Sequence, residues 1–222
     1  MWCVAKLDEA YIERMEDVLK IYEKPLLERA PVVCLDEKPV LLHEDTRPPA
    51  GLRPGQLARR DYEYKRYGTA NVFCAVEPKA GRHFAKPTAT RKSPEFAEFL
   101  LEIAASYLRA DTIHLVLDNL STHTRKAVTD HYGEKNGAWL WGRFTVHYTP
   151  KHGSWLNQAE IEIGIFSRQC LGKRRIGNLT DLSTETRAWN QRINRAKTTI
   201  DWKFTRKKAR LKLKYNIMRS RY

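Results

Sequence analysis

The sequence predicts an α/β fold in which helices flank a mixed five-stranded sheet. One observation behind this is the order of patterns along the chain: three strands, then a helix, a strand, a helix, a strand and a helix. Another is that the first and fourth strands, at 32–36 and 113–118, are short apolar runs typical of strands buried on both faces. Each run finishes in an aspartate, Asp36 or Asp118, so two acidic side chains are expected at strand ends.

The first part of the chain is expected to form a helix and an antiparallel meander. The helix covers 8–24, where apolar side chains recur at helical spacing between acids and lysines. A loop punctuated by proline and glycine is expected over 46–56. Strands follow at 69–77 and 82–86, separated by a turn at 78–81. The apolar face of the first helix is expected to comprise Tyr11, Met15, Val18, Leu19 and Tyr22.

Capping residues or amphipathic patterns mark three further helices. Ser93 is an expected N-cap, and Pro94 follows at the first helical position. An amphipathic pattern over 180–193 predicts the last long helix. Thr205 is expected to cap a short basic helix that runs to Tyr215.

The segment after the fourth strand contains a further helix. Ser121 or Thr122 is expected to cap it, and it runs to about Tyr132. Glycines and polar residues over 133–137 predict a flexible connection to the fifth strand. That strand is expected at 144–148, which is β-branched and aromatic.

The stretch from His147 to Glu160 joins the fifth strand to a helix. This helix is expected to begin near Trp155 or Leu156, with Glu160 on the edge of its apolar face. Glu162 lies on the opposite flank of the same face, so periodicity alone does not choose between the two glutamates. The buried face is expected to comprise Leu156, Ala159, Ile163, Phe166 and Cys170.

Three carboxylates from two strand ends and one helix repel each other unless a cation lies between them. Mg²⁺ prefers such oxygen ligands. A pair of ions can stabilise both the attacking and the leaving oxygen of a phosphoryl transfer. The acidic pattern therefore indicates metal-dependent chemistry on phosphate esters.

Charge and composition point to a polyanionic partner. The 222 residues include 40 Lys and Arg against 26 Asp and Glu, which gives a formal net charge of +14. The positive charge is clustered, because 203–222 holds nine lysines and arginines and no acid. Nucleic acid is the natural partner of such a chain. The four cysteines are scattered without CxxC spacing, which argues against a zinc or redox site.

Three motifs carry a resemblance to a known family. Leu-Asp36-Glu-Lys-Pro39, Leu-Asp118-Asn-Leu-Ser-Thr-His123 and the stretch from Tyr148 to Glu160 closely resemble the catalytic blocks of DDE transposases. The subgroup is the bacterial insertion-sequence transposases related to the mariner superfamily. The resemblance extends from about residue 2 to residue 202. It implies a ribonuclease H-like, retroviral integrase-like fold.

The resemblance also implies a catalytic site and a cofactor. Asp36, Asp118 and Glu160 become the catalytic and metal-binding triad, and it is the resemblance that selects Glu160 over Glu162. The cofactor is expected to be Mg²⁺ or Mn²⁺, as two ions. Hydrolysis would nick the ends of the element, and the freed 3′-hydroxyls would attack target DNA at TA dinucleotides.

Partners and location follow from the same resemblance. Double-stranded DNA is expected to bind as terminal inverted repeats and as target, with the protein acting as a dimer. No apolar run approaches the roughly 20 residues of a membrane span, and no secretory signal is seen. A cytoplasmic, nucleoid-associated bacterial protein is expected. Family members carry helix-turn-helix modules ahead of this region, so the chain is expected to be a catalytic half.

Residues around the triad receive supporting roles. Asn119 and Asn157 are expected to orient the carboxylates, although helix capping explains them nearly as well. His123 is expected to orient the loop after Asp118. Glu37 is expected to point to the face opposite Asp36, and His147 to be packed or hydrogen-bonded in its strand. The candidate DNA-binding residues are Arg59, Arg60, Lys65, Arg66, Lys151, His152, Lys207, Lys208 and Arg210. An exposed strand with alternating tyrosines is an equal alternative for the segment 59–66.

Three units are expected along the chain: an N-terminal helix and linker over 1–30, the catalytic domain over 31–195, and a basic extension over 196–222. Two rival functions stay open. One is another ribonuclease H-like nuclease, which cuts without joining. The other is a non-catalytic DNA-binding remnant, against which the presence of all three acids argues.

Overall fold

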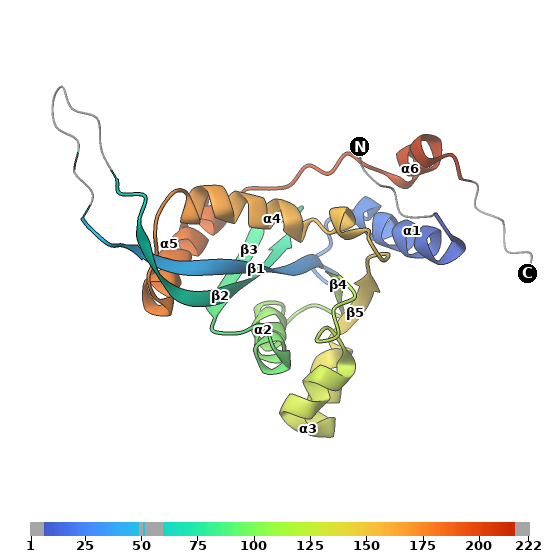
Figure 1. Cartoon of the computed structure of the whole chain (residues 1–222). Coiled ribbons are helices and arrows are strands. Elements are labelled where there is room, and N and C mark those ends of the chain that lie inside the picture. The colour runs from blue at the N-terminus through green and yellow to red at the C-terminus, as the bar shows by residue number, and fades with distance from the viewer. Residues whose placement is uncertain (1–6, 49–50, 52–59, 216–222) are drawn as a thin grey trace, which may run out of the picture.

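The computed structural model describes residues 7–48, 51 and 60–215 as a mixed five-stranded sheet between two layers of helices (Figure 1). The strand order is β3-β2-β1-β4-β5. The strands are β1 (Val32–Asp45), β2 (Tyr64–Glu77), β3 (Arg82–Thr88), β4 (Ile113–Leu117) and β5 (Phe144–Tyr148). The helices are α1 (Glu9–Glu23), α2 (Ser93–Ser106), α3 (Arg125–Gly142), α4 (Ala159–Phe166), α5 (Leu179–Ala196) and α6 (Arg206–Leu213). The predicted sheet and helical layers are confirmed.

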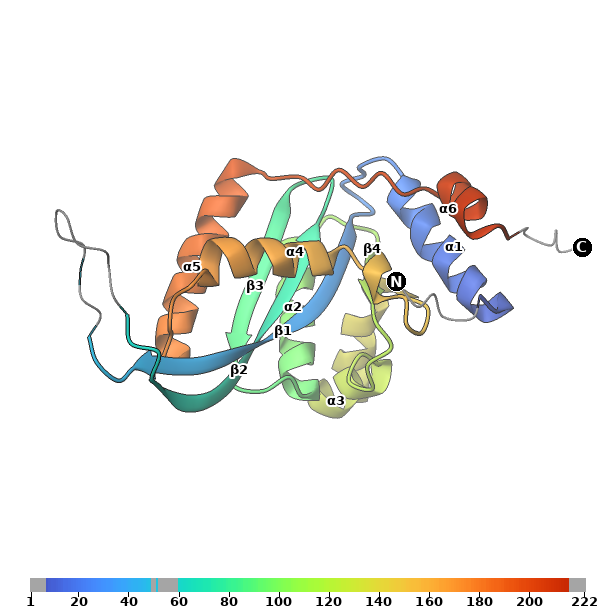
Figure 2. The same ribbon diagram turned by 45° about the horizontal axis from the view of Figure 1, so that its top comes forward.

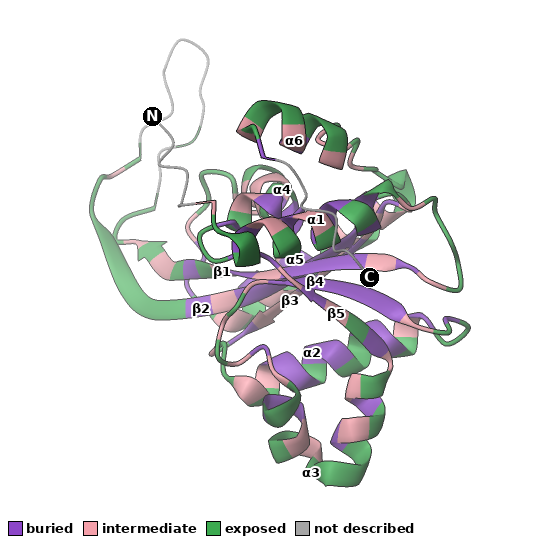
Figure 3. Cartoon of the chain, turned by 90° about the vertical axis from the view of Figure 1, so that its right-hand side faces the viewer, coloured by how far each residue is buried: buried purple, intermediate pink, exposed green. Residues whose placement is uncertain are grey.

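Side-chain alternation along β1 decides which layer each residue meets. Val33 and Leu35 join the core beneath α2 and α3, whereas Cys34 joins the core beneath α1. Figure 1 shows α2 and α3 on one face of the sheet and α1, α4, α5 and α6 on the other. Both faces of the central strands are therefore buried, as Figure 3 shows by colour.

The pairing of the strands is mixed in the way the element order predicts. β1 pairs antiparallel with β2, and β2 pairs antiparallel with β3, which confirms the meander. β4 pairs parallel with both β1 and β5. The β1–β4 pairing covers only Val32 to Cys34, so the rest of β1 has no strand on that side.

β1 is longer than the sequence predicts, and Asp36 is not at its end. The strand continues through Pro39 to Asp45, paired throughout with β2, and β2 begins at Tyr64 instead of residue 69. Pro39 is tolerated because β1 is an edge strand on its β4 side at this point. The outer part of this hairpin projects beyond the helical layers (Figure 2). Residues 64–66 are thus strand, the alternative left open for that segment.

Arginines fasten the base of the hairpin to the segment before α5. The Arg175 guanidinium donates to Asp45 Oδ1 and to the backbone oxygens of Asp61 and Glu63. Arg60 holds the same aspartate through two 2.7 Å hydrogen bonds. These contacts therefore fix the position of the hairpin at the end of β1.

Two helix starts differ from the prediction. The N-cap of α2 is Lys92, with no capping side chain, and Ser93 is already helical. The N-cap of α3 is Thr124 instead of Ser121 or Thr122, and its hydroxyl accepts from Ala127 N. Serine and threonine are common near helix starts, so composition locates the region better than the residue.

The expected connection over 133–137 is also wrong, because most of it is helical. Only Gly133 departs from helical geometry, with φ 78° and ψ 161°, and the chain then resumes a helix to Gly142. The two halves pack together at Gly137, where a Cβ would lie 2.5 Å from Thr129 Cα. A break at one glycine and close contact at another produce a helical hairpin.

The helix that carries Glu160 begins later than expected. Ser154–Leu156 form a 3₁₀ turn, and α4 starts at Ala159. Its buried residues include Ala159, Glu162 and Phe166, whereas Ile163 is only partly buried. Glu160 is exposed in the first turn, not on the edge of the buried face one turn in. The apolar pattern located the helix but not its rotation.

α6 packs on α1 through paired charges. Arg210 forms two hydrogen bonds of 2.7–2.8 Å with Glu16, whose Oε1 also accepts from the Tyr215 hydroxyl. Arg206 pairs with Glu23 in the same way. Thr205 caps α6, as predicted. In the part of the chain that the structure describes, no helix is long and apolar enough to cross a membrane.

Candidate functional site

The β1–β4 pairing leads to two of the acidic residues. In the parallel β1–β4 pair, Val32 lies opposite His114 and Cys34 lies opposite Val116. Asp36 and Asp118 each follow the last of these paired positions by two residues, Asp36 within β1 and Asp118 directly after β4. Both aspartates therefore lie in the part of the sheet where β1 and β4 separate.

Glu160 enters this region from α4. Asp36 is partly buried, and burial raises its pKa to about 7, with repulsion from Glu160, Glu37 and Asp118 adding to the shift. The Glu37 N–H donates to Asp36 Oδ1 at 2.8 Å and opposes part of that rise. This repulsion is consistent with the grouping of three carboxylates predicted from the sequence.

Asp118 is held by its own loop. Its Oδ1 accepts from His123 Nδ1 at 2.7 Å and from Leu120 N at 3.1 Å. These bonds outweigh the effect of burial and lower the pKa of Asp118, with a contribution from the positive charge of Arg91. His123, expected to orient this loop, therefore contacts the carboxylate directly.

The sequence did not suggest that Glu37 contacts His123. It points to the α2 side of the sheet, opposite Asp36, as expected, and there its Oε1 lies 2.7 Å from His123 Nε2. Burial lowers the pKa of the His123 imidazole, but the hydrogen bonds to Asp118 and Glu37 outweigh it and raise the pKa to about 9. The buried ring thus bridges two carboxylates.

The two asparagines contact backbone, not carboxylates. Asn119 Nδ2 donates to Thr149 O at 2.6 Å, which links the loops after β4 and β5. Asn157 Nδ2 donates to Leu35 O at 2.8 Å, and its Oδ1 accepts from Ala159 N at 3.1 Å. Asn157 therefore attaches the start of α4 to β1 one residue before Asp36.

Glu162 has surroundings of a different kind. Its side chain is fully buried, and its Oε2 lies 2.8 Å from His83 Nδ1. The other ring nitrogen of His83 lies 2.8 Å from Thr198 O. Glu162 is thus engaged in a buried pair beneath α4, while Glu160 on the other flank is exposed. This geometry favours Glu160 as the third carboxylate of the set.

The basic candidates occupy three surfaces. Lys65 and Arg66 are exposed on the projecting hairpin, where Arg60 is tied to Asp45, and Arg59 lies outside the described residues. Lys151 and His152 are exposed in the turn after β5. Lys207 and Lys208 are exposed on α6, whereas Arg210 is paired with Glu16. The turn after β5 follows a strand that pairs with β4, and Asp118 directly follows β4.

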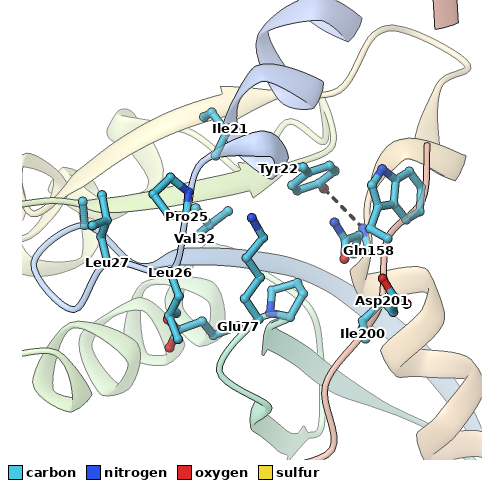
Figure 4. Close-up of a pocket in the computed structure, with 14 residues that line it drawn as sticks. Ile21, Tyr22, Pro25, Leu26, Leu27, Val32, Glu77, Gln158, Ile200 and Asp201 are labelled. Atoms are coloured by element: carbon cyan, nitrogen blue, oxygen red, sulfur yellow. Dashed lines mark hydrogen bonds between the residues drawn. The ribbon is translucent and has the colours of Figure 1, made fainter. Parts of the chain in front are cut away.

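His147 and a cavity near the end of α1 lie outside the acidic set. His147 is buried in β5 between His114 and Asp17, as its position in a strand predicted. A cavity of about 150 Å³ lies between the end of α1 and the chain near Trp202 (Figure 4). There the Tyr22 hydroxyl accepts from Gln158 N at 3.4 Å, and none of the three carboxylates lines the cavity. It is not the candidate site.

The donor set fits a hard divalent cation. Carboxylate oxygens are the ligands that Mg²⁺ and Mn²⁺ prefer. The repulsion that raises the pKa of Asp36 is the kind a bound cation would reverse. Within residues 7–48, 51 and 60–215, no group of three or more His, Cys, Asp or Glu side chains is arranged to hold a metal ion. The assignment of an ion to Asp36, Asp118 and Glu160 therefore stays a prediction from the sequence.

Fold and site together define a class: a carboxylate-bearing mixed sheet of the kind that acts on phosphodiesters in nucleic acids. A sequence model described as "DDE superfamily endonuclease" matches residues 31–183. The chain belongs to that family. No curated protein sequence matches the chain.

Solved structures confirm the ribonuclease H-like fold. The Mos1 mariner paired end complex with Mn has a TM-score of 0.55 at 17% identity, covering 89% of this chain and 61% of that one. The Mos1 Strand Transfer Complex has a TM-score of 0.54 at 17% identity, with 89% and 60% covered. The Mos1 paired end complex with Mg has a TM-score of 0.51 at 15% identity, covering 89% of this chain and 62% of that one. The chain thus spans about three fifths of the transposase chains it resembles.

Proposed function

We propose that the chain is the catalytic part of an insertion-sequence transposase. It cuts DNA at the ends of the element and joins the freed ends to target DNA at TA dinucleotides. The observation that carries this is the parallel β1–β4 pairing, whose last paired position is followed two residues later by Asp36 and by Asp118. Repulsion from Glu160 and Asp118 adds to the raised pKa of Asp36 and supports this grouping. Membership of an endonuclease family supports cleavage, and the likeness to a Strand Transfer Complex supports joining.

Mg²⁺ or Mn²⁺ is the proposed cofactor, as two ions held by Asp36, Asp118 and Glu160. When bound, such ions lower the pKa of the attacking water or 3′-hydroxyl and offset charge on the leaving oxygen. The chain's own residues supply position. His123 fixes one oxygen of Asp118, and Asn157 attaches the start of α4, which carries Glu160, to β1.

The proposed substrate is double-stranded DNA, as terminal inverted repeats and as target. Lys151 and His152, exposed in the turn after β5, are proposed to contact phosphates near the scissile bond. Lys65 and Arg66 on the hairpin, together with α6, extend the positive surface away from it. Because transposition brings two ends together, a dimer on DNA is proposed, acting on nucleoid DNA in a bacterial cytoplasm.

The test incubates the purified chain with a labelled duplex bearing a terminal repeat and a TA-containing plasmid, with Mg²⁺ or Mn²⁺. Asp118→Asn runs in parallel, because it keeps the shape of the side chain and removes the charge. Metal-dependent joining that the variant loses supports the proposal. Cleavage without joining would indicate a plain nuclease, and DNA binding without either reaction would indicate a non-catalytic remnant.

A further inference from the structure

Three hydrogen-bonded side chains connect β1 to the loop after β4. Glu37 Oε1 lies 2.7 Å from His123 Nε2, and His123 Nδ1 lies 2.7 Å from Asp118 Oδ1. The His123 side chain is 0% exposed and that of Glu37 is 2% exposed, whereas that of Asp118 is 35% exposed. Two enclosed groups thus support a third that reaches the surface of the site.

The surroundings of His123 leave the ring little freedom. Its face lies against Phe96, with ring centroids 4.6 Å apart. Its backbone N–H donates to Leu120 O at 2.9 Å, and its carbonyl accepts from the Tyr148 hydroxyl at 2.7 Å. With backbone and ring face both fixed, the direction of Nδ1 depends on what Nε2 binds.

The bonds to Asp118 use only one of its oxygens. His123 and Leu120 both donate to Oδ1, and among the described residues no donor contacts Oδ2. A carboxylate held at one oxygen presents the other in a fixed direction. This arrangement suits a side chain that must point at a cation.

We propose that Glu37 is a positioning residue for the proposed metal site. Through His123 it fixes the orientation of Asp118, so that Oδ2 faces the space shared with Asp36 and Glu160. Glu37 itself does not reach that space, because it projects from the α2 side of the sheet. This inference rests on the proposed function only in taking Asp118 as a metal-binding residue.

Binding of Mn²⁺ to the full chain, measured from the electron paramagnetic resonance of the unbound ion, tests the proposal. Glu37→Ala is expected to weaken binding by at least about tenfold, the usual effect of removing a partner of a metal ligand. Glu37→Gln is expected to restore most of the affinity, because an amide also forms a hydrogen bond with Nε2. In an Asp118→Asn background, Glu37→Ala should add less than about a twofold change, because its effect passes through Asp118.

Glu77→Ala is the matched control. Glu77 is buried like Glu37 and accepts a 2.9 Å hydrogen bond from the Tyr107 hydroxyl, but it lies at the β2–β3 turn. Its loss is expected to lower the melting temperature without changing Mn²⁺ affinity beyond about twofold. Equal losses of affinity in both alanine variants, or unchanged affinity in Glu37→Ala, would overturn the proposal.

If Glu37→Ala does not fold, a measurement on the wild-type chain still tests the proposal. In a ¹⁵N spectrum of the imidazoles, the ring N–H protons of His123 should be protected from solvent and should shift when Mg²⁺ is added. A His123 signal indifferent to Mg²⁺, in a chain that binds the ion, refutes the role of Glu37. A wild-type chain that binds neither ion refutes the proposed function instead.

Discussion

Glu160 and Glu162 are two residues apart on α4, yet their surroundings differ completely. Glu160→Gln is expected to leave the melting temperature unchanged, because the side chain is exposed. It should lower DNA cleavage by on the order of a hundredfold or more, because a carboxylate of the proposed metal site is lost. Cleavage of a labelled duplex and a thermal melt provide the two measurements.

Unlike Glu160→Gln, Glu162→Ala is expected to destabilise the folded chain. It leaves His83 buried without its carboxylate partner, which is expected to cost about 3 kcal/mol of unfolding free energy in a denaturant titration. A stable Glu162→Ala variant with normal folding would show that the pair of Glu162 and His83 contributes little to stability.

For the other glutamate, a Glu160→Gln variant with full cleavage activity would exclude Glu160 from the proposed triad.

Asp36 makes a prediction about pH. Its pKa is about 7 in the folded chain and about 3.9 in the unfolded chain, so folding favours the protonated form. The stability it contributes is therefore present below about pH 4 and is lost as the pH rises to about 7. Asp36→Asn should be increasingly more stable than the wild type over that window in metal-free buffer. A difference in unfolding free energy that stays constant with pH would contradict this cause.

Which residues meet at the site was only partly predictable from the sequence. Motifs identified Asp36, Asp118 and His123, because they lie in short recognisable blocks. The contact between Glu37 and His123 joins residues far apart in the sequence, and it depends on how the β4 loop folds over the sheet. Local patterns carry no information on that tertiary contact. Alternation in β1 did predict the face to which Glu37 points.

At the scale of single elements, the helical hairpin α3 offers a direct comparison of two glycines. Gly137→Ala would bring a Cβ to 2.5 Å from Thr129 Cα, so the two halves must move apart. A loss of about 1–3 kcal/mol is expected. Gly142→Ala meets nothing within 4 Å and should be neutral or slightly stabilising. Urea titrations of both variants measure the difference, and equal stabilities would show that Gly137 does not set the packing.

Element boundaries show where sequence patterns stop being informative. The order of strands and helices followed from periodicity, and Thr205 was identified as a cap. The length of β1 was not predicted, because a proline such as Pro39 normally marks the end of a strand. Pro39 is tolerated here only because β4 has diverged from β1 at this point. The helix from residue 134 to Gly142 was missed because glycine and polar residues have low helix propensity, which packing at Gly137 overrides.

Across the whole molecule, positive charge is expected to set how DNA binding depends on salt. Lys207 and Lys208 are exposed on α6, which is anchored to α1 by Arg210 and Glu16. Replacing both lysines by alanine should reduce the slope of log affinity against log salt by about 2, or 0.9 per phosphate contact. Fluorescence anisotropy at several salt concentrations measures the slope.

The control for this prediction is Arg125→Ala with Lys126→Ala on α3. These two cations are exposed as well, but they pair with Glu134 and Asp130 on the other face of the sheet. Their loss should leave the slope unchanged. If both double variants lower the slope equally, DNA binding is a property of the net charge of +14 and not of the α6 surface.

The register between β1 and β4 limits how this sequence can change in evolution. Side chains alternate between the faces of β1, so inserting or deleting one residue between Val32 and Asp36 would carry the aspartate to the side now occupied by Glu37. The fold can tolerate single substitutions in this segment, but it cannot tolerate a change in the segment's length. Variation in length is therefore expected in the loops before β1 and within the projecting hairpin, while the spacing from Val32 to Asp36 stays constant.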